Sequence, residues 1–348
     1  MKLLLLFALV ALSNSQHIGY SEEDEVQWEL FKIEYEKDYR DEEELTRKEI
    51  FMNNLNFIRC HNEKYERGEV TFTVGINQFA DWTNDEIRKM SGIRPLSPPI
   101  KPPDSDPRRG ATTELQKRSM FEMDENLEPP KTLDWRKKGA VTPVKDQGKC
   151  GSDYIFSAVG SIEGQNFLKT KKLVSLSVQQ IVDCGNWYYY DVRGCSGGDI
   201  KGVFEDDTIF FGIFTEAFYP YQAKKGICRD NATEPRVIYH DYVDVIRESE
   251  KALQQAVAKI GPISVAIDAR HHSFLLYKSG VYKEPACSSQ KLDHGMLVIG
   301  YGTTTNGEEF WLVKNSWGTS WGMKGYIMMA RNHDNMCGIA SHASYPIL

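Results

Sequence analysis

The sequence lacks an excess of positive charge, and it lacks an apolar run long enough to span a bilayer. Its 348 residues include 42 Lys and Arg against 49 Asp and Glu, which gives a formal net charge of −7. This balance, without a dense basic patch, argues against nucleic acid as a partner. The apolar run from Leu3 to Leu12 is too short for a transmembrane helix, and no later segment is longer. The length and composition are ample for a packed core in one or two domains.

The N-terminus has the pattern of a secretory signal peptide. Lys2 precedes the apolar run, and the small residues at 13–15 are suited to cleavage before Gln16. A buried N-terminal helix is the alternative, but the basic flank and the polar restart favour the signal. We therefore expect residues 1–15 to be a signal peptide. The protein would then enter the secretory pathway, with an extracellular or lysosomal destination and no membrane anchor.

The cysteine content fits a secretory route, which permits disulfides. The chain has seven cysteines, and six of them follow residue 130. They are Cys60, Cys150, Cys184, Cys195, Cys228, Cys287 and Cys337. Asn231, followed by Ala232 and Thr233, is an acceptor for N-glycosylation, although so short a motif often occurs by chance.

Residues 22 to 92 are polar and have a helical pattern. Six residues recur at spacings of three and four, so they share one helix face: Glu43, Arg47, Phe51, Asn54, Ile58 and Asn62. Periodicity alone indicates an ordinary amphipathic helix. Residue by residue, however, this set resembles the helix motif of cathepsin L-type propeptides. A second set resembles their second motif: Gly75, Asn77, Phe79 and Asp81. The resemblance implies a helical inhibitory propeptide over residues 16–92, whose tail runs through the cleft of a protease domain.

Residues 93–130 form a predicted linker that would hold the propeptide tail and the maturation site. Its prolines forbid regular helix and favour extended, exposed chain. They are Pro95, Pro98, Pro99, Pro102, Pro103 and Pro107. The dibasic pairs Arg108-Arg109 and Lys117-Arg118 are candidate processing sites, although solvated charge in a loop is the more common explanation.

After the linker, helical patterns come first and strand patterns later. One helix is expected from near Asp153 to about Lys169, and another over residues 249–260, where Gly261-Pro262 ends it. The period then changes to two. Strands are therefore predicted at 263–267, 296–301, 310–314 and 326–329. This order predicts an α+β protein with two lobes.

From Leu133 to Pro346 the sequence resembles the papain family of cysteine proteases, and cathepsin L in particular. The segment from Gln147 to Ser157 has the spacing of the signature Cys-Gly-Ser/Ala-Cys-Trp/Tyr, but Asp153 stands where its second cysteine is expected. The resemblance implies a papain-like fold over residues 131–348. In that fold a helical lobe and a β-barrel-like lobe face each other across the substrate cleft.

A cysteine protease needs a thiolate, a histidine to activate it, a group to orient the histidine and donors for the oxyanion. The resemblance implies that Gln147 is the side-chain oxyanion donor, His294 the catalytic histidine and Asn315 the orienting residue. Trp317 and Trp321 match the aromatic cover of that pair. Taken alone, His294 is as well explained as a satisfied core histidine, but the combination favours the catalytic interpretation.

The nucleophile does not carry over. The resemblance implies three disulfides, which leave no thiol for the role: Cys150–Cys195, Cys184–Cys228 and Cys287–Cys337. Cys60 has no partner by this count, and we expect it to be half-buried on its helix. Ser152 is one position early on the turn and is expected to point elsewhere. An aspartic-protease mechanism needs a second carboxylate, and the sequence does not provide one at this site.

Asp153 has a good structural interpretation instead. A carboxylate stabilises a helix N-terminus through capping and through the helix dipole. Beside a protonated His294 it would reproduce the charges of a thiolate–imidazolium pair, an attraction of about 4 kcal/mol at ~4 Å and an effective dielectric of ~20 before desolvation. We therefore predict that the fold survives the loss of peptidase activity.

Loss of the nucleophile need not close the cleft. By resemblance, Gly197 and Gly198 pair through their backbone with substrate, and Asp199, Ile200 and His342 occupy positions of the S2 pocket. An acidic Asp199 departs from an apolar pocket, and His342 replaces the usual small residue. Either these two pair and narrow the pocket, or they are a solvated aspartate and a packed histidine.

The loop between Cys184 and Cys195 contains four adjacent aromatic residues, at positions 187–190. They would form either a recognition patch or a small satellite core. The second interpretation is favoured because large aromatic side chains are usually well buried.

These inferences predict a cathepsin L-like zymogen without useful peptidase activity, acting as a monomer without cofactor or metal. Its partners would be peptide or protein segments in the cleft, including its own propeptide, and a structural or storage role is a further option. Two alternatives stay open. The chain could remain a functioning cysteine-type endopeptidase, or its released propeptide could inhibit active relatives. The sequence does not identify a substrate, a partner or the processing protease.

Overall fold

The computed structural model describes residues 20–94, 119–206, 212–229, 234 and 236–348. Four of the expectations above fall outside these ranges: the signal peptide, the prolines of the linker, both dibasic pairs and the glycosylation acceptor Asn231.

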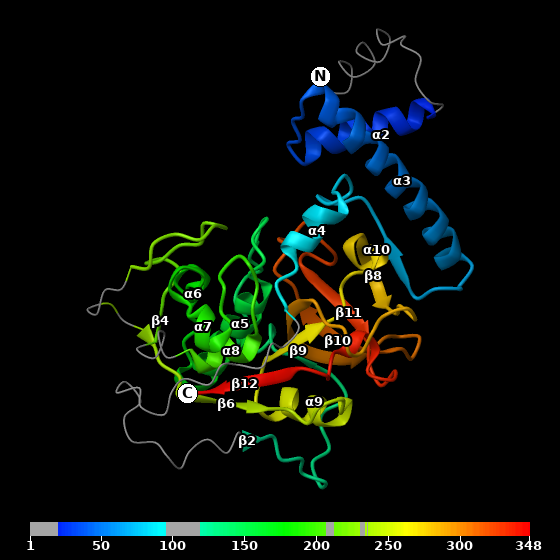
Figure 1. The fold of residues 1–348 in the computed structure, drawn as a ribbon. Helices are drawn as coiled ribbons and strands as arrows, with labels where there is room; N and C mark the ends of the chain where they lie inside the picture. The colour runs from blue at the N-terminus through cyan, green and yellow to red at the C-terminus, as the bar shows by residue number, and fades with distance from the viewer. Residues whose placement is uncertain (1–19, 95–118, 207–211, 230–233, 235) are drawn as a thin grey trace.

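Two long helices form the N-terminal part of the described chain, α2 (Glu22–Glu34) and α3 (Asp41–Glu66). Ser21 caps α2 in a capping box with Asp24, which satisfies orphan N–H groups at the helix start. The helices pack through aromatic rings, with the Phe31 and Phe51 centroids 4.8 Å apart. Figure 1 shows this blue helical pair above the main body, with α3 running down towards α10 and β8.

The predicted face of α3 holds the segment that follows it. Asn54 donates to the carbonyl of Ala80 at 2.7 Å, and Asn62 donates to the carbonyl of Val74 at 2.9 Å. The helix prediction is therefore confirmed, and the polar members of the pattern are hydrogen-bond donors to a neighbouring segment. The expectation for Cys60 was wrong, because this free cysteine is exposed.

The segment after α3 attaches these helices to the main sheet. Strand β1 (Phe72–Val74) pairs antiparallel with β8 (Tyr277–Tyr282), with Phe72 opposite Gly280. Helix α4 (Asn84–Met90) follows, and Figure 1 shows it in cyan above the junction of the green helices and the orange strands. The chain then descends between these two halves as far as residue 94.

One half of the main body is helical. Its elements are α5 (Asp153–Thr170), α6 (Val178–Cys184), α7 (Trp187–Tyr190) and α8 (Ile200–Glu205), with the short strands β4 (Ile213–Phe214) and β5 (Arg236–Val237). The central helix α5 matches the predicted range to within a residue, and twelve of its side chains are buried. Two of the predicted disulfides, Cys150–Cys195 and Cys184–Cys228, brace this lobe.

The other half is dominated by a ten-stranded sheet with the order β1-β8-β11-β10-β9-β7-β12-β6-β2, and β3 pairs with β9. Its remaining strands are β2 (Ser119–Met120), β3 (Leu133–Asp134), β6 (Asp241–Asp244), β7 (Ile263–Ile267), β9 (His294–Thr303), β10 (Glu309–Lys314), β11 (Tyr326–Ala330) and β12 (Ala343–Ile347). All four predicted strands are present. The end of the predicted linker is bound to the sheet, because β2 pairs in parallel with β6.

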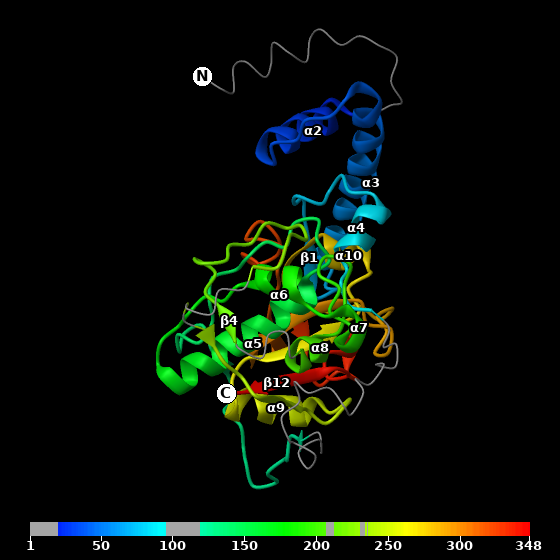
Figure 2. The same cartoon turned by 60° about the vertical axis from the view of Figure 1, so that its left-hand side comes forward.

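Short helices flank this sheet: α9 (Glu250–Lys259), α10 (His272–Leu275) and the 3-10 turn η3 (Met336–Gly338). The third predicted disulfide, Cys287–Cys337, lies in this lobe. Figure 2 shows α5 to α8 on the near side, with the strands behind them. Within the described ranges, no helix has the length and apolar character needed to cross a membrane.

Candidate active site

Asp153 opens α5 at the boundary between the two lobes, and its side chain is fully buried. A helix N-terminus presents unpaired N–H groups and a partial positive charge, both of which stabilise a carboxylate. The Oδ1 atom accepts from the Tyr154 backbone N–H at 2.5 Å, and Oδ2 lies 2.6 Å from His294 Nδ1. The sequence elements that place these groups are thus a helix start on one lobe and a strand start on the other.

His294 is the first residue of β9 and is fully buried. Its Nε2 atom lies 2.8 Å from Asn315 Oδ1, which also accepts from the Ser316 backbone N–H at 2.8 Å. Both ring nitrogens therefore face acceptors, and only the doubly protonated ring donates to both. Burial lowers the pKa of His294, but the charge of Asp153 and the hydrogen bonds outweigh it, so this pKa is raised above its ordinary value.

The Gln147 side chain is held in one orientation beside this pair. Its Oε1 atom accepts from Ser316 Oγ at 2.7 Å, while Nε2 donates to the Cys150 carbonyl at 2.9 Å and to the Met90 carbonyl at 2.7 Å. Met90 is the last residue of α4, so the amide that faces the cleft is bonded to the main chain at the end of this helix.

Aromatic rings cover the histidine. The Trp317 ring centroid is 4.7 Å from that of His294, and Trp321 packs against Trp317 at 5.2 Å. From the propeptide side, Phe79 stacks edge-on against Trp317 at 5.3 Å. These rings exclude water, so the ion pair lies in surroundings of low polarity.

The chain after α4 lies in the cleft. The Gly92 N–H donates to Asp153 Oδ2 at 2.9 Å, and its carbonyl accepts from the Gly198 N–H at 2.8 Å. Arg94 continues this pairing through its N–H and the Gly198 carbonyl at 3.3 Å. Gly197 lies alongside, and a Cβ there would overlap the Gly92 carbonyl. Ser152 points away from this site and hydrogen-bonds the Tyr221 hydroxyl at 2.7 Å, as expected.

A cavity of about 380 Å³ adjoins the end of this segment, and Asp199 and His342 both line it. Asp199 Oδ1 is 2.9 Å from His342 Nε2, so of the two alternatives the paired one holds. Burial raises the pKa of Asp199, but the His342 contact lowers it further, so this pKa is below its ordinary value. Ile200 does not line the cavity, because it is fully buried in the core of the helical lobe.

Sequence reasoning missed two features of this cleft. Lys201 and Asp244 form an ion pair at 2.8 Å in the cavity wall, and Gly92 contacts Asp153 directly. The sequence did carry a signal for the contact between Gly92 and Asp153. Ser91-Gly92 ends a charged helical segment, and a glycine at such a place marks a close approach of backbone. The first carried no signal because its partners are 43 residues apart in the chain.

The aromatic loop is partly a satellite core. Tyr190 is buried and Tyr189 packs against the core of the helical lobe, whereas Tyr188 is 49% exposed. The favoured interpretation therefore holds for two of the tyrosines.

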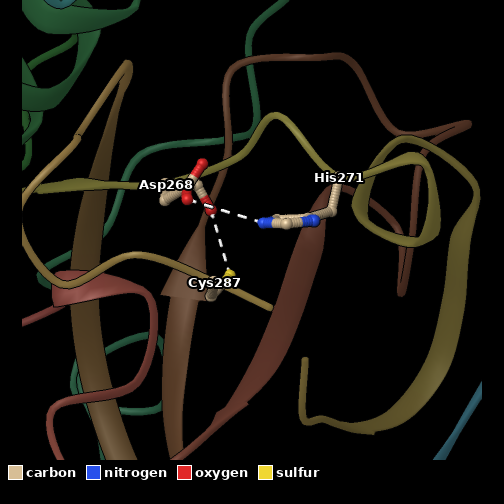
Figure 3. Close-up of side chains that lie close together, drawn as sticks. All are labelled: Asp268, His271 and Cys287. Atoms are coloured by element: carbon tan, nitrogen blue, oxygen red, sulfur yellow. Dashed lines mark hydrogen bonds and ion pairs between the residues drawn. The ribbon is translucent and has the colours of Figure 1, made fainter. Parts of the chain in front are cut away.

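One cluster on the strand-rich lobe has metal-ligand residue types. Asp268, His271 and Cys287 bring their ligand atoms within 4.8 Å of one another, as Figure 3 shows. The donor set does not suit a metal ion, because the Cys287 sulfur is bonded to Cys337 and is no thiolate. Asp268 is also engaged by the Arg270 side chain at 2.9 Å and the Ser288 N–H at 2.8 Å.

Comparisons with known proteins agree with this architecture. The model of the papain family cysteine proteases matches residues 129–347, and that of the cathepsin propeptide inhibitor domain matches residues 28–87. A cathepsin L-like peptidase of Aedes aegypti is 43% identical over 99% of both chains. Digestive cysteine proteinase 1 of Homarus americanus is 48% identical over 92% of this chain and 94% of its own.

Solved structures give the same result. The digestive procathepsin L 3 of Tenebrio molitor superimposes with a TM-score of 0.81 and 36% identity, over 94% of this chain and all of the other. The predicted papain-like α+β fold with a helical propeptide is therefore confirmed. The chain belongs to the papain family of cysteine proteases, as a cathepsin L-like member that carries its own propeptide inhibitor domain.

Proposed function

We propose that this protein is a catalytically inactive member of the family whose cleft binds peptide segments without cleaving them. The observation that carries the proposal is the position of Asp153. It begins α5 and contacts His294 Nδ1 at 2.6 Å, where the family signature places the nucleophilic cysteine. We assign His294, Asn315 and Gln147 to the remaining places of the catalytic set.

No cysteine is available to replace the nucleophile. Of the seven in the sequence, six form the three disulfides. The seventh, Cys60, is exposed on α3 of the propeptide. The thiolate is the species that attacks in this chemistry, so a cleft without a thiol lacks the first step.

The carboxylate is not a substitute. Attack by Asp153 on an amide would form an anhydride, while the water mechanism of aspartic proteases needs two carboxylates that share a proton. The recorded hydrogen-bond partners of Asp153 are all N–H donors, from Gly92, Tyr154 and His294. In this environment the carboxylate acts as a hydrogen-bond acceptor.

The groups that hold a peptide backbone are present. Gln147 and Gly198 already bind the main chain of the propeptide. We further propose that the chain is a secreted or lysosomal monomer, glycosylated at Asn231. Its proposed regions are a signal at 1–15, a propeptide at 16–92, a linker at 93–130 and a mature domain at 131–348.

A peptidase assay tests this proposal. The propeptide is removed by an added protease, and the product is assayed at acidic pH with a fluorogenic cathepsin L peptide and a thiol-directed epoxide probe. The wild type is expected to show neither hydrolysis nor labelling. Asp153→Cys, processed in the same way, is the positive control and is expected to gain both. Hydrolysis by the wild type that His294→Ala abolishes would overturn the proposal.

Maturation gives an independent test. A chain without a nucleophile does not clip itself, so the purified proform is expected to stay intact on acidification until a protease is added. Processing at a rate independent of added protease contradicts this expectation.

A further inference from the structure

We propose that Asp153 is a peptide-binding residue, and that its carboxylate makes the cleft selective for extended segments with glycine opposite it. The ligand class is a peptide with the pattern glycine, apolar residue, arginine, as in Gly92-Ile93-Arg94. This inference rests on the proposed function and names the ligand of the same cleft.

Five hydrogen bonds hold the main chain of the bound segment. Four run from Gln147 Nε2 to the Met90 carbonyl (2.7 Å), from the Gly92 N–H to Asp153 Oδ2 (2.9 Å), from the Gly198 N–H to the Gly92 carbonyl (2.8 Å) and from the Arg94 N–H to the Gly198 carbonyl (3.3 Å). The fifth comes from the strand-rich lobe, where the Asp293 carbonyl accepts from the Ile93 N–H at 3.2 Å. In this set Asp153 is the side-chain acceptor, so its chemistry decides whether the central N–H is satisfied.

A carboxylate suits that place for two reasons. An ionised carboxylate only accepts hydrogen bonds, and bonds to a charged acceptor are about twice as strong as neutral ones. His294 Nδ1 contacts the same Oδ2 atom at 2.6 Å and fixes its position. The Gly92 N–H is buried, so without Asp153 it would have no partner and would carry the full cost of desolvation.

Glycine is required at position 92 by space. A Cβ atom there would overlap Asp153 Oδ1 and the Gly151 carbonyl oxygen. Both neighbours are held in place. The Gly151 N–H donates to the Cys195 carbonyl at 3.1 Å beside the Cys150–Cys195 disulfide, and Asp153 is bonded to the Tyr154 N–H and to His294. A ligand with any side chain at this position would have to break the N–H contact with Asp153.

The side chains of Ile93 and Arg94 account for the apolar and the basic position of the proposed ligand pattern. Ile93 is partly buried and packs against the core of the helical lobe. The Arg94 guanidinium donates from Nε to the Ser196 carbonyl at 2.8 Å. An apolar residue and a basic residue after glycine are therefore the side chains that the cleft contacts.

Hydrogen exchange on the full-length proform tests the acceptor role. In Asp153→Ala the amide of residue 92 is expected to exchange about tenfold faster than in the wild type, because the charged acceptor is gone. In Asp153→Asn, which retains a neutral acceptor, a smaller acceleration is expected. Wild-type exchange at residue 92 in a folded Asp153→Ala protein would overturn the inference.

A second measurement tests the glycine and does not alter Asp153. The proform is cut within residues 95–118 by an added protease, and the dissociation rate of the propeptide is measured. Gly92→Ala is expected to accelerate release at least tenfold. Arg88→Ala is the matched control, because this exposed side chain of α4 pairs with the exposed Asp85 of the same helix, and an effect below threefold is expected. Equal rates for the two variants would contradict the glycine requirement.

The two proposals fail separately. Peptide hydrolysis by the processed wild type refutes inactivity and leaves the exchange result standing. Unchanged exchange and release in a protein that cleaves nothing refutes the binding role of Asp153 alone.

Discussion

The cleft contains two aspartate–histidine pairs, and they differ in their surroundings. In each pair the aspartate lies at the N-terminus of a helix, α5 for Asp153 and α8 for Asp199, and the histidine comes from the strand-rich lobe. Asp153 and His294 are fully buried at 2.6 Å, whereas the Asp199 and His342 side chains are 14% and 13% exposed at 2.9 Å. The same two residue types therefore form one pair with fully buried side chains and one pair whose side chains are partly exposed.

The difference teaches how burial sets the strength of a pair. Both nitrogens of His294 face protein acceptors, so loss of a partner leaves a buried charge without compensation. Water can take the place of a partner in the second pair, whose attraction is accordingly weaker. Asp199 has a further role as the cap of α8, through the Lys201 N–H at 3.1 Å.

The largest expected difference is in stability. Asp153→Ala should lower the free energy of unfolding by about 3 kcal/mol or more, because it removes one partner of a buried pair. Denaturant unfolding of the proform with its disulfides intact measures this value. His342→Ala, in the less buried pair, is the matched comparison, and an equal loss of stability in both variants would show that burial is not the deciding factor.

The second effect is on the imidazole itself. Asp153→Asn removes the negative charge but keeps the side-chain volume, so the pKa of His294 should fall. NMR titration of the His294 ring resonances measures it. Asp199→Asn serves as the control, because it neutralises the other aspartate. A His294 pKa unaffected by Asp153→Asn would mean that the two groups do not interact.

The two pairs should also limit stability at opposite ends of the pH scale. The raised pKa of His294 means that its contribution is present below the ordinary histidine pKa and is lost as pH rises through the raised value. The lowered pKa of Asp199 means that its contribution is present above the ordinary aspartate pKa and is lost as pH falls through the lowered value.

Unfolding midpoints measured across pH check both signs. In Asp153→Asn, the fall of the unfolding midpoint at alkaline pH should disappear. In Asp199→Asn, the fall of the midpoint at acidic pH should become smaller. The comparison would be contradicted if Asp153→Asn changed the acid limb of the pH profile and Asp199→Asn changed the alkaline limb.

The smallest effect is expected for His342→Gln. This change should alter the free energy of unfolding by less than about 1 kcal/mol, because the pair is partly exposed and screened. The same denaturant experiment measures it. A loss of unfolding free energy as large as that of Asp153→Ala would show that the Asp199–His342 pair stabilises the protein as strongly as the Asp153–His294 pair.

The sequence by itself determined several main helices and strands and part of the cleft. Helix α5 and the four predicted strands follow from local periodicity, whereas the three disulfides and the propeptide were expected from the resemblance to the papain family. It also determined that a carboxylate, and not a thiol, begins α5. Such properties depend on neighbouring residues, which one sequence displays directly.

Only the tertiary structure decided which residues from different elements contact one another and which face solvent. Cys60 is exposed because two residues of helix turn it away from Ile58 on the packed face. Ile200 faces the core of the helical lobe, and the Asp199–His342 pair joins residues 143 positions apart. The Gly92 N–H reaches Asp153 across 61 positions. These contacts depend on how two lobes and a propeptide pack against one another. Periodicity within a single helix or strand carries no information about which distant residues it will meet.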